Sequence, residues 1–159
     1  MDIYKEIKAY TDENFQRIVD LRGHFHENPE LSEKEFKTRE KIKEELSGLD
    51  ISYLPVEGTS LIGVMDTGRP GKTLVLRSDM DALDISERED NNKEKKKFVS
   101  KNPGVSHMCG HDAHMTILIE SLKFLYNKKD QLAGRLSFVF EEAVETWKGI
   151  DRVLHSLEG

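Results

Sequence analysis

The chain has 159 residues, which is enough for one domain with a substantial core and too short to predict two. Its hydrophobic fraction of 36%, charged fraction of 34% and net charge of −6 are typical of a globular protein and give no reason to expect a nucleic acid or a membrane as partner. A single cysteine excludes an internal disulfide, and no stretch resembles a signal peptide or a transmembrane helix. These features predict a cytoplasmic protein.

A first helix is predicted from apolar residues at helical spacing. They are Ile3, Ile7, Tyr10, Ile18 and Leu21. A polar stretch over residues 22–28 follows and is closed by Pro29. Within this stretch, His24 and His26 lack the spacing that would place two ligands on one helix face, so we expect a structural or substrate-proximal histidine rather than a metal ligand.

A second helix is predicted from a capping box. Ser32 can cap its N-terminus, Glu35 stands three residues later as the capping-box partner, and Gly48 is placed to end the helix. Leu31 and Phe36 are predicted to form a hydrophobic staple, and the apolar face continues through Ile42 and Leu46.

Three short apolar runs, residues 60–65, 73–78 and 135–140, predict strands. A helix is expected between the second and third of these runs. Its apolar stripe is Met115, Leu118, Leu122 and Leu125. Helices that alternate with short strands predict the α/β class, with an αβα sandwich built on a mixed sheet.

Residues 106–114 hold three of the six histidines and the only cysteine. Cys109 and His111 are two positions apart, and a thiolate beside an imidazole suits zinc or a later first-row divalent ion. Gly110 permits a tight turn between them. Taken alone, the pattern is better explained as a buried cysteine beside surface histidines, so other segments must decide.

Carboxylates follow two of the predicted strands. Asp79 and Asp81 come after the second strand, and Glu141, Glu142 and Glu145 come after the third. In open α/β sheets, ligands bind outside the carboxyl ends of strands. Each acidic residue alone is better explained as a helix cap or a solvated turn, but three segments that meet at one edge favour a metal site.

Several blocks of the chain resemble a known family. Residues 76–83 (Leu-Arg-Ser-Asp-Met-Asp-Ala-Leu) are similar to the segment Arg-Ala-Asp-Met-Asp-Ala-Leu-Pro, and residues 107–114 to His-x-Cys-Gly-His-Asp-x-His, of the aminoacylase, hippurate hydrolase and auxin-conjugate hydrolase group of metallopeptidase-like amidohydrolases. Residues 21–36 look like the N-terminal signature of that group, and residues 140–145 like a weaker fourth block.

The resemblance implies part of a zinc-peptidase-like catalytic domain with two divalent ions, whether zinc, manganese, cobalt or nickel. It also implies hydrolysis of the amide bond in small N-acyl amino acids. By the same resemblance, Cys109 bridges the two ions, His111 and Glu145 are further metal ligands, and Asp81 has a catalytic role.

The chain also departs from that family. Val144 occupies the position of the general base, and Asp84 stands where the family has proline. Members of the family continue through a lid or dimerisation domain that supplies two more histidine ligands, and His155 matches neither of them. Residues 1–159 are therefore expected to be the N-terminal part of a catalytic domain, without the lid and the C-terminal segment.

Two functions remain open from these departures. The chain is an amidohydrolase fragment with little or no activity, or a non-catalytic remnant that binds a metal or a partner. Apolar surface left uncovered in such a fragment predicts self-association.

Overall fold

The computed structural model describes residues 2–91 and 93–157. Within them, four strands form one sheet in the order β1-β2-β4-β3. The strands are β1 (Ser52–Leu54), β2 (Leu61–Asp66), β3 (Thr73–Asp79) and β4 (Arg135–Glu141). β2 pairs antiparallel with both β1 and β4, whereas β3 runs parallel to β4. The predicted mixed sheet is confirmed.

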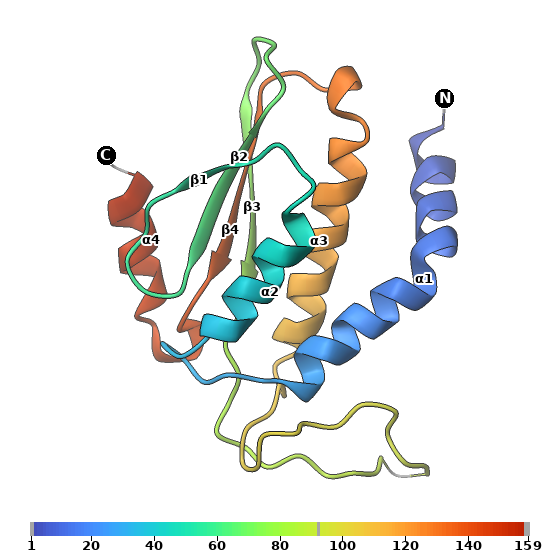
Figure 1. The fold of residues 1–159 in the computed structure, drawn as a ribbon, viewed down its shortest axis with the longest axis vertical. Coiled ribbons are helices and arrows are strands. Elements are labelled where there is room, and N and C mark those ends of the chain that lie inside the picture. The colour runs from blue at the N-terminus through green and yellow to red at the C-terminus, as the bar shows by residue number, and fades with distance from the viewer. Residues whose placement is uncertain (1, 92, 158–159) are drawn as a thin grey trace.

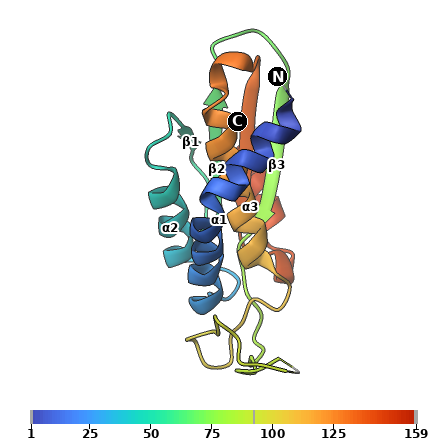
Figure 2. The ribbon, with the colours of Figure 1, turned by 90° about the vertical axis from the view of Figure 1, so that its right-hand side faces the viewer.

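Helices cover both faces of this sheet, so the predicted αβα sandwich is also confirmed. The helices are α1 (Ile3–Glu27), α2 (Phe36–Leu46), α3 (His111–Tyr126) and α4 (Gly149–Leu157). Figure 1 shows α4 on one side of the strands and the other three helices on the opposite side, and Figure 2 looks onto that three-helix layer.

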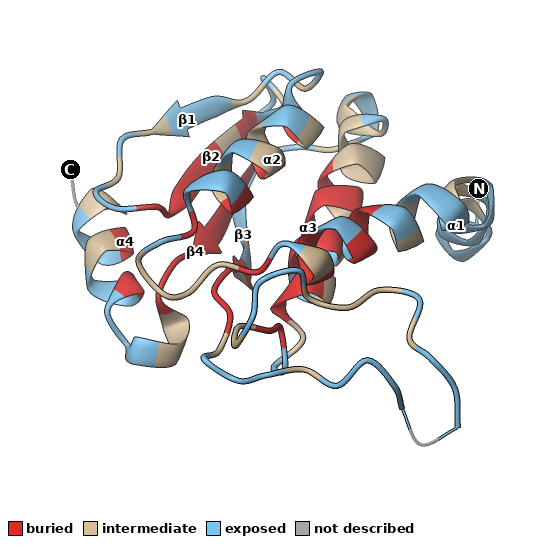
Figure 3. Ribbon diagram, turned by 60° about the horizontal axis from the view of Figure 1, so that its bottom comes forward, coloured by how far each residue is buried: buried red, intermediate tan, exposed pale blue. Residues whose placement is uncertain are grey.

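The alternation of side chains along β2 and β4 explains these layers. Leu61 and Phe138 point into the larger core, which α1, α2 and α3 close. Their neighbours Ile62 and Val139 point to the other face and pack against Val153 of α4. In Figure 3 the buried residues accordingly lie along the sheet and on the helix surfaces that face it.

The first helix is longer than its polar composition suggested. α1 continues to Glu27, through the polar stretch that follows the last predicted apolar position, Leu21. The reason is that Leu21 and Phe25, four residues apart on one helical face, both enter the core. His26, on the adjoining side of the helix, is buried with them.

The predicted capping box at Ser32 is wrong. α2 begins at Phe36 with Glu35 as its N-cap residue, and no side chain caps it. Ser32 instead donates a hydrogen bond to a distant carboxylate, that of Asp81. Phe36 is 61% exposed, so the staple expected between Leu31 and Phe36 does not bury the Phe36 ring.

The three predicted strands and the predicted third helix are present within about one residue at the strand ends. β1 and α4 were not predicted. β1 has three residues that are largely exposed, and Gly149 begins α4 where a helix is not expected. In the part of the chain that the structure describes, no helix has the length and apolar character needed to cross a bilayer.

Candidate metal centre

The parallel pair β3 and β4 ends at the edge of the sheet where α3 begins (Figure 1). Gly110 precedes α3 in the left-handed conformation, with φ of 79°, which glycine adopts without strain. This turn leaves Cys109 exposed and puts His111 at the first position of the helix, where it is buried. Sequence and backbone geometry thus agree on why a glycine separates the two side chains.

Asp81 links three segments beside this turn. Its Oδ2 accepts a hydrogen bond from the Ser32 hydroxyl (2.7 Å) and another from the backbone N–H of Glu145 (2.9 Å). Its backbone carbonyl oxygen lies 2.8 Å from Nδ1 of His111. Asp81 is 1% exposed, and its contacts reach both His111 and Glu145.

The contact with Asp81 fixes the tautomer of His111. A carbonyl oxygen can only accept a hydrogen bond, so Nδ1 must carry a proton, and the neutral ring presents the lone pair of Nε2. Burial alone would lower the pKa of His111, but the neighbouring Asp81 and Asp79 outweigh it and raise that pKa. The ring of His111 therefore lies among carboxylates that favour a positive charge.

Glu145 is presented by a short 3₁₀ turn, Val144–Thr146. Ala143, just before it, has φ of 52°, a left-handed conformation that an alanine adopts only when its surroundings hold it there. Glu35 supplies that restraint, because its Oε1 accepts the backbone N–H of Ala143 at 2.9 Å. Burial raises the pKa of Glu35.

Of the four site residues predicted from sequence, Asp81 and three candidate ligands, the three ligands bring their donor atoms together. Sγ of Cys109, a ring nitrogen of His111 and a carboxylate oxygen of Glu145 all lie within 4.8 Å of one another. Nε2 of His111 is 3.7 Å from Oε1 of Glu145. A divalent ion with bonds of about 2.0–2.3 Å can gather such atoms through small side-chain movements, so the donor set fits a zinc-type ion.

The thiol of Cys109 is held in its protonated form when no ion is present. A hydrogen bond to Glu145 is the main cause that raises the pKa of Cys109, and the nearby carboxylates add to the effect. An ion bound here must therefore displace a proton from sulfur.

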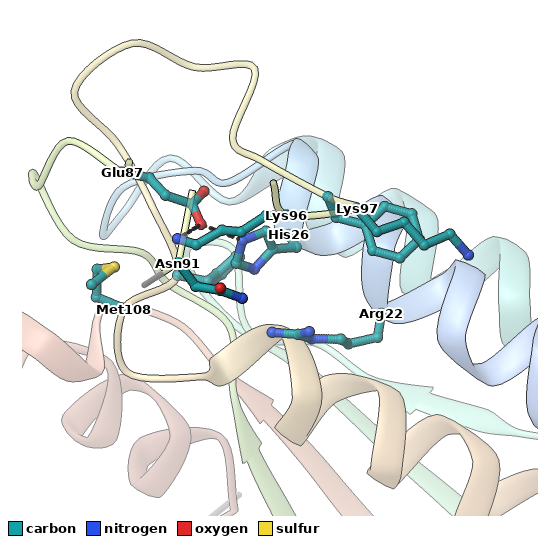
Figure 4. Close-up of a pocket in the computed structure, with 9 residues that line it drawn as sticks. Arg22, His26, Glu87, Asn91, Lys96, Lys97 and Met108 are labelled. Carbon is teal, nitrogen blue, oxygen red and sulfur yellow. Dashed lines mark hydrogen bonds and ion pairs between the residues drawn. The ribbon is translucent and has the colours of Figure 1, made fainter. Parts of the chain in front are cut away.

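The start of α3 is held by a buried charged network. Asp112 accepts from His26 Nδ1 at 2.7 Å and pairs with Arg22 Nε at 2.9 Å. The other ring nitrogen of His26 lies 2.9 Å from Glu87, and Figure 4 shows Lys96 and His26 directed at that same carboxylate. His26 is thus a structural histidine, and the described residues offer no group of close metal donors around it.

These charges shift one another's pKa values. The hydrogen bond to Asp112 is the main cause that raises the pKa of His26. Burial opposes the ionisation of Glu87, but Lys96, the Ser100 N–H and His26 outweigh it and lower the pKa of Glu87 to about 2. These shifts favour the charged forms of His26 and Glu87, and the two residues line an open hollow of about 380 Å³.

His107, in the same histidine-rich run, is not brought to the donor group. It is 4% exposed, and its two ring nitrogens have no hydrogen-bond partner among the described residues. Burial lowers its pKa to about 4, so the ring is neutral.

The carboxylates beside Val144 have other partners. Glu141 pairs with Arg77, and Glu142 pairs with Arg152 at 2.7 Å while also accepting from Thr59. Both glutamates are buried. The structure therefore offers neither of them as a substitute for the base that the resemblance places at Val144.

Sequence analysis did not identify two features of this site. The role of Glu35 was attributed to a helix cap, although it holds the turn before Glu145. His114 was not singled out, yet its Nδ1 is 2.9 Å from Oδ1 of Asp79. Its spacing of three from His111 on a helix was the available signal.

Comparison with known proteins places this fold and site in context. A model of peptidase family M20/M25/M40 matches residues 75–158, which include every residue of the donor group. The chain belongs to this family. The membership confirms the resemblance to metallopeptidase-like amidohydrolases.

Individual relatives support the same assignment. The chain is 38% identical over 148 residues to an N-acyl-L-amino acid amidohydrolase of Geobacillus stearothermophilus, covering 91% of this chain and 38% of that protein. It is 37% identical over 147 residues to the thermostable carboxypeptidase 2 of Saccharolobus solfataricus, covering 91% of this chain and 36% of the relative.

A solved structure agrees with the fold. The Bacillus subtilis YXEP protein, described as a dinuclear metal binding peptidase of the M20 family, superposes with a TM-score of 0.82 at 32% identity. The superposition covers 95% of this chain and 40% of YXEP. The chain thus spans a little over a third of the length of these relatives.

Proposed function

We propose that this chain provides the metal-binding part of an amidohydrolase that cleaves the amide bond of small N-acyl amino acids. The observation that carries the proposal is the donor group of Cys109, His111 and Glu145, at the carboxyl ends of parallel strands in an M20 fold. The amidohydrolase named among the relatives acts on substrates of this class by its description. In this proposal residues 1–159 correspond to the N-terminal part of the catalytic domain.

The roles of the residues follow from their contacts. Cys109, His111 and Glu145 hold a divalent ion, for which zinc, manganese, cobalt and nickel are the candidates. Such an ion supplies Lewis-acid activation of an amide carbonyl and of water. Asp81 orients Nε2 of His111 and the backbone before Glu145, so it is a positioning residue of the centre.

In this proposal the site lacks a general base for proton transfer. Val144 has no group that takes a proton, and Glu141 and Glu142 are engaged with arginines. A positioned acid or base contributes about 10²–10⁴ in rate. We therefore propose that the 159-residue chain binds a divalent ion but hydrolyses N-acyl amino acids slowly or not at all.

Hydrolysis assays on N-acetyl amino acids with and without Zn²⁺ test this proposal. We expect metal binding that Cys109→Ala weakens, and negligible turnover that Val144→Glu alone does not restore, because a bridged metal pair needs further ligands. Metal-dependent turnover by the unmodified chain, abolished by Cys109→Ala, would contradict the inactive state. A Cd²⁺ affinity that is unchanged by Cys109→Ala would contradict the metal centre itself, because Cd²⁺ favours thiolate sulfur.

Two further properties belong to the proposal. The chain self-associates through β3, an edge strand on which Leu74 and Val75 are 58% and 56% exposed. It works in the cytoplasm, because a metal-binding thiol such as Cys109 must remain reduced.

A further inference from the structure

Asp79, His111 and His114 form a second group of donor atoms beside the proposed centre. One carboxylate oxygen and one ring nitrogen from each histidine all lie within 4.8 Å of one another. Two imidazoles and a carboxylate are a donor set that holds zinc and other borderline divalent ions in proteins. Of these three residues, only His111 has a role in the proposed function.

Regular structure holds this second group in place. His111 and His114 are three residues apart in the first turn of α3, so their side chains share a face, and their rings stack with centroids 5.6 Å apart. Asp79 is the last residue of β3, and its Oδ1 is 2.9 Å from Nδ1 of His114. A strand end and a helix start position ligands more rigidly than a loop does.

An ion can reach this group from solvent. The side chain of His114 is 51% exposed. It borders an open hollow of about 450 Å³, which Asp79 and Ile117 also line. The guanidinium of Arg77 is 3.8 Å from Oδ2 of Asp79 and pairs through its Nε with Glu141, whereas Oδ1 of Asp79 contacts His114.

The two donor groups share one atom. Nε2 of His111 lies 3.6 Å from Oδ2 of Asp79 and 3.7 Å from Oε1 of Glu145. A neutral imidazole nitrogen has one lone pair and binds one ion at a time. We propose that this chain has two mutually exclusive positions for one divalent ion: a sulfur-containing position at Cys109, His111 and Glu145, and a nitrogen-rich position at Asp79, His111 and His114.

Ligand chemistry predicts which ions select each position. Thiolate sulfur favours a soft ion such as Cd²⁺, whereas a pair of imidazoles with a carboxylate suits Ni²⁺. Only the first position rests on the proposed function. The second rests on the contacts of His114 and Asp79.

Titrations of the 159-residue chain with CdCl₂ and with NiCl₂ test the two positions separately. Cadmium binding is followed by the ultraviolet sulfur-to-cadmium charge-transfer band, and nickel binding by isothermal titration calorimetry. We expect His114→Ala to weaken Ni²⁺ binding by about tenfold or more and to leave the Cd²⁺ band unchanged. Cys109→Ser should abolish the Cd²⁺ band and spare Ni²⁺ binding.

Adding NiCl₂ to the cadmium-loaded chain tests whether the positions exclude each other. The charge-transfer band should fall as nickel takes His111, and it should fall less in His114→Ala. An unchanged band while nickel binds stoichiometrically would overturn mutual exclusion.

The matched control is His155→Ala, which removes an exposed histidine of α4 and should leave both titrations unchanged. Nickel affinity that His114→Ala leaves at the wild-type value would overturn the second position. Absence of a cadmium band in the unmodified chain would instead overturn the first position, and the proposed function with it.

Discussion

His111 donates its Nδ1 proton to the carbonyl oxygen of Asp81 across 2.8 Å, and this contact aims the free Nε2 at two carboxylates. Asp81 reaches the same centre by a second route, because its side chain accepts the backbone N–H of Glu145. One residue thus orients a nitrogen donor through its main chain and an oxygen donor through its side chain. The geometry of the metal centre therefore depends on a residue that need not touch the ion.

We expect Asp81→Ala to weaken Cd²⁺ binding by about 10–100-fold, the usual effect of losing an outer contact to metal ligands. The change leaves the backbone N–H of Glu145 without its acceptor, while the carbonyl at position 81 still orients His111. Titration by the sulfur-to-cadmium band measures the effect. Ser32→Ala, which removes one hydrogen bond to Asp81, is the matched control and should have a smaller effect. Equal affinities of the Asp81→Ala variant and wild type would contradict this role.

Glu35 should stabilise the fold mainly as a neutral hydrogen-bonding group. Oγ1 of Thr59 lies 2.6 Å from both Glu35 and Glu142, and its single proton serves one of them. Burial raises the pKa of Glu35, which favours its neutral form, and in that form its carboxyl proton serves the other contact.

Glu35→Ala should lower the free energy of unfolding by about 1–3 kcal/mol, because the buried N–H of Ala143 loses its acceptor. Glu35→Gln keeps an acceptor and a donor and should lower it less. An acid with a raised folded pKa stabilises the fold at low pH and loses that contribution as pH rises. The difference in the free energy of unfolding between wild type and Glu35→Gln should therefore be smallest at high pH. Urea unfolding at several pH values checks both expectations, and equal losses in the two variants would contradict them.

The pH dependence of stability should carry the signature of His26. Its folded pKa is raised by Asp112 and by Glu87, so its contribution is fully present below its unfolded pKa of about 6.5 and is lost as pH rises through the folded value. The free energy of unfolding should fall as pH rises above about 6.5 and through the raised folded pKa of His26, and His26→Gln should flatten this slope. His155→Gln, at an exposed histidine, is the control; a slope unchanged by His26→Gln would contradict the prediction.

Self-association through β3 should be sensitive to a single charge. Val75→Lys puts a cation in the middle of an exposed edge strand, where pairing with a second copy would bury it. Sedimentation velocity should show the unmodified chain as a mixture that shifts with concentration, and the variant as a monomer. Tyr4→Lys, at an exposed residue of α1 away from the edge, should sediment as the unmodified chain does. A wild-type chain that is monomeric at all concentrations would contradict self-association through this edge.

Local patterns predicted much of this fold because they record which side of an element is buried. The apolar runs around Ile62 and Val139 mark strands with helices on both faces, and the stripe of Met115 and Leu118 marks the face of α3 that meets the sheet. The same patterns misplaced the end of α1 and the cap of α2. In both cases a contact with a distant part of the chain set the outcome. Phe25 enters the core and extends α1, and the hydroxyl of Ser32 donates to the carboxylate of Asp81 instead of capping α2.

By itself, the sequence determined the αβα class, the family resemblance and the residue types of the metal centre, since ligand chemistry and hydrophobic periodicity are properties of short segments. Only the tertiary structure decided that Asp81 positions ligands, that Glu35 holds the turn before Glu145, and that His114 lies against Asp79. These relationships join residues 30 to 108 positions apart in the chain. Spacing along the chain does not specify them, because the packing of α3 against the parallel strands sets the distances between those atoms.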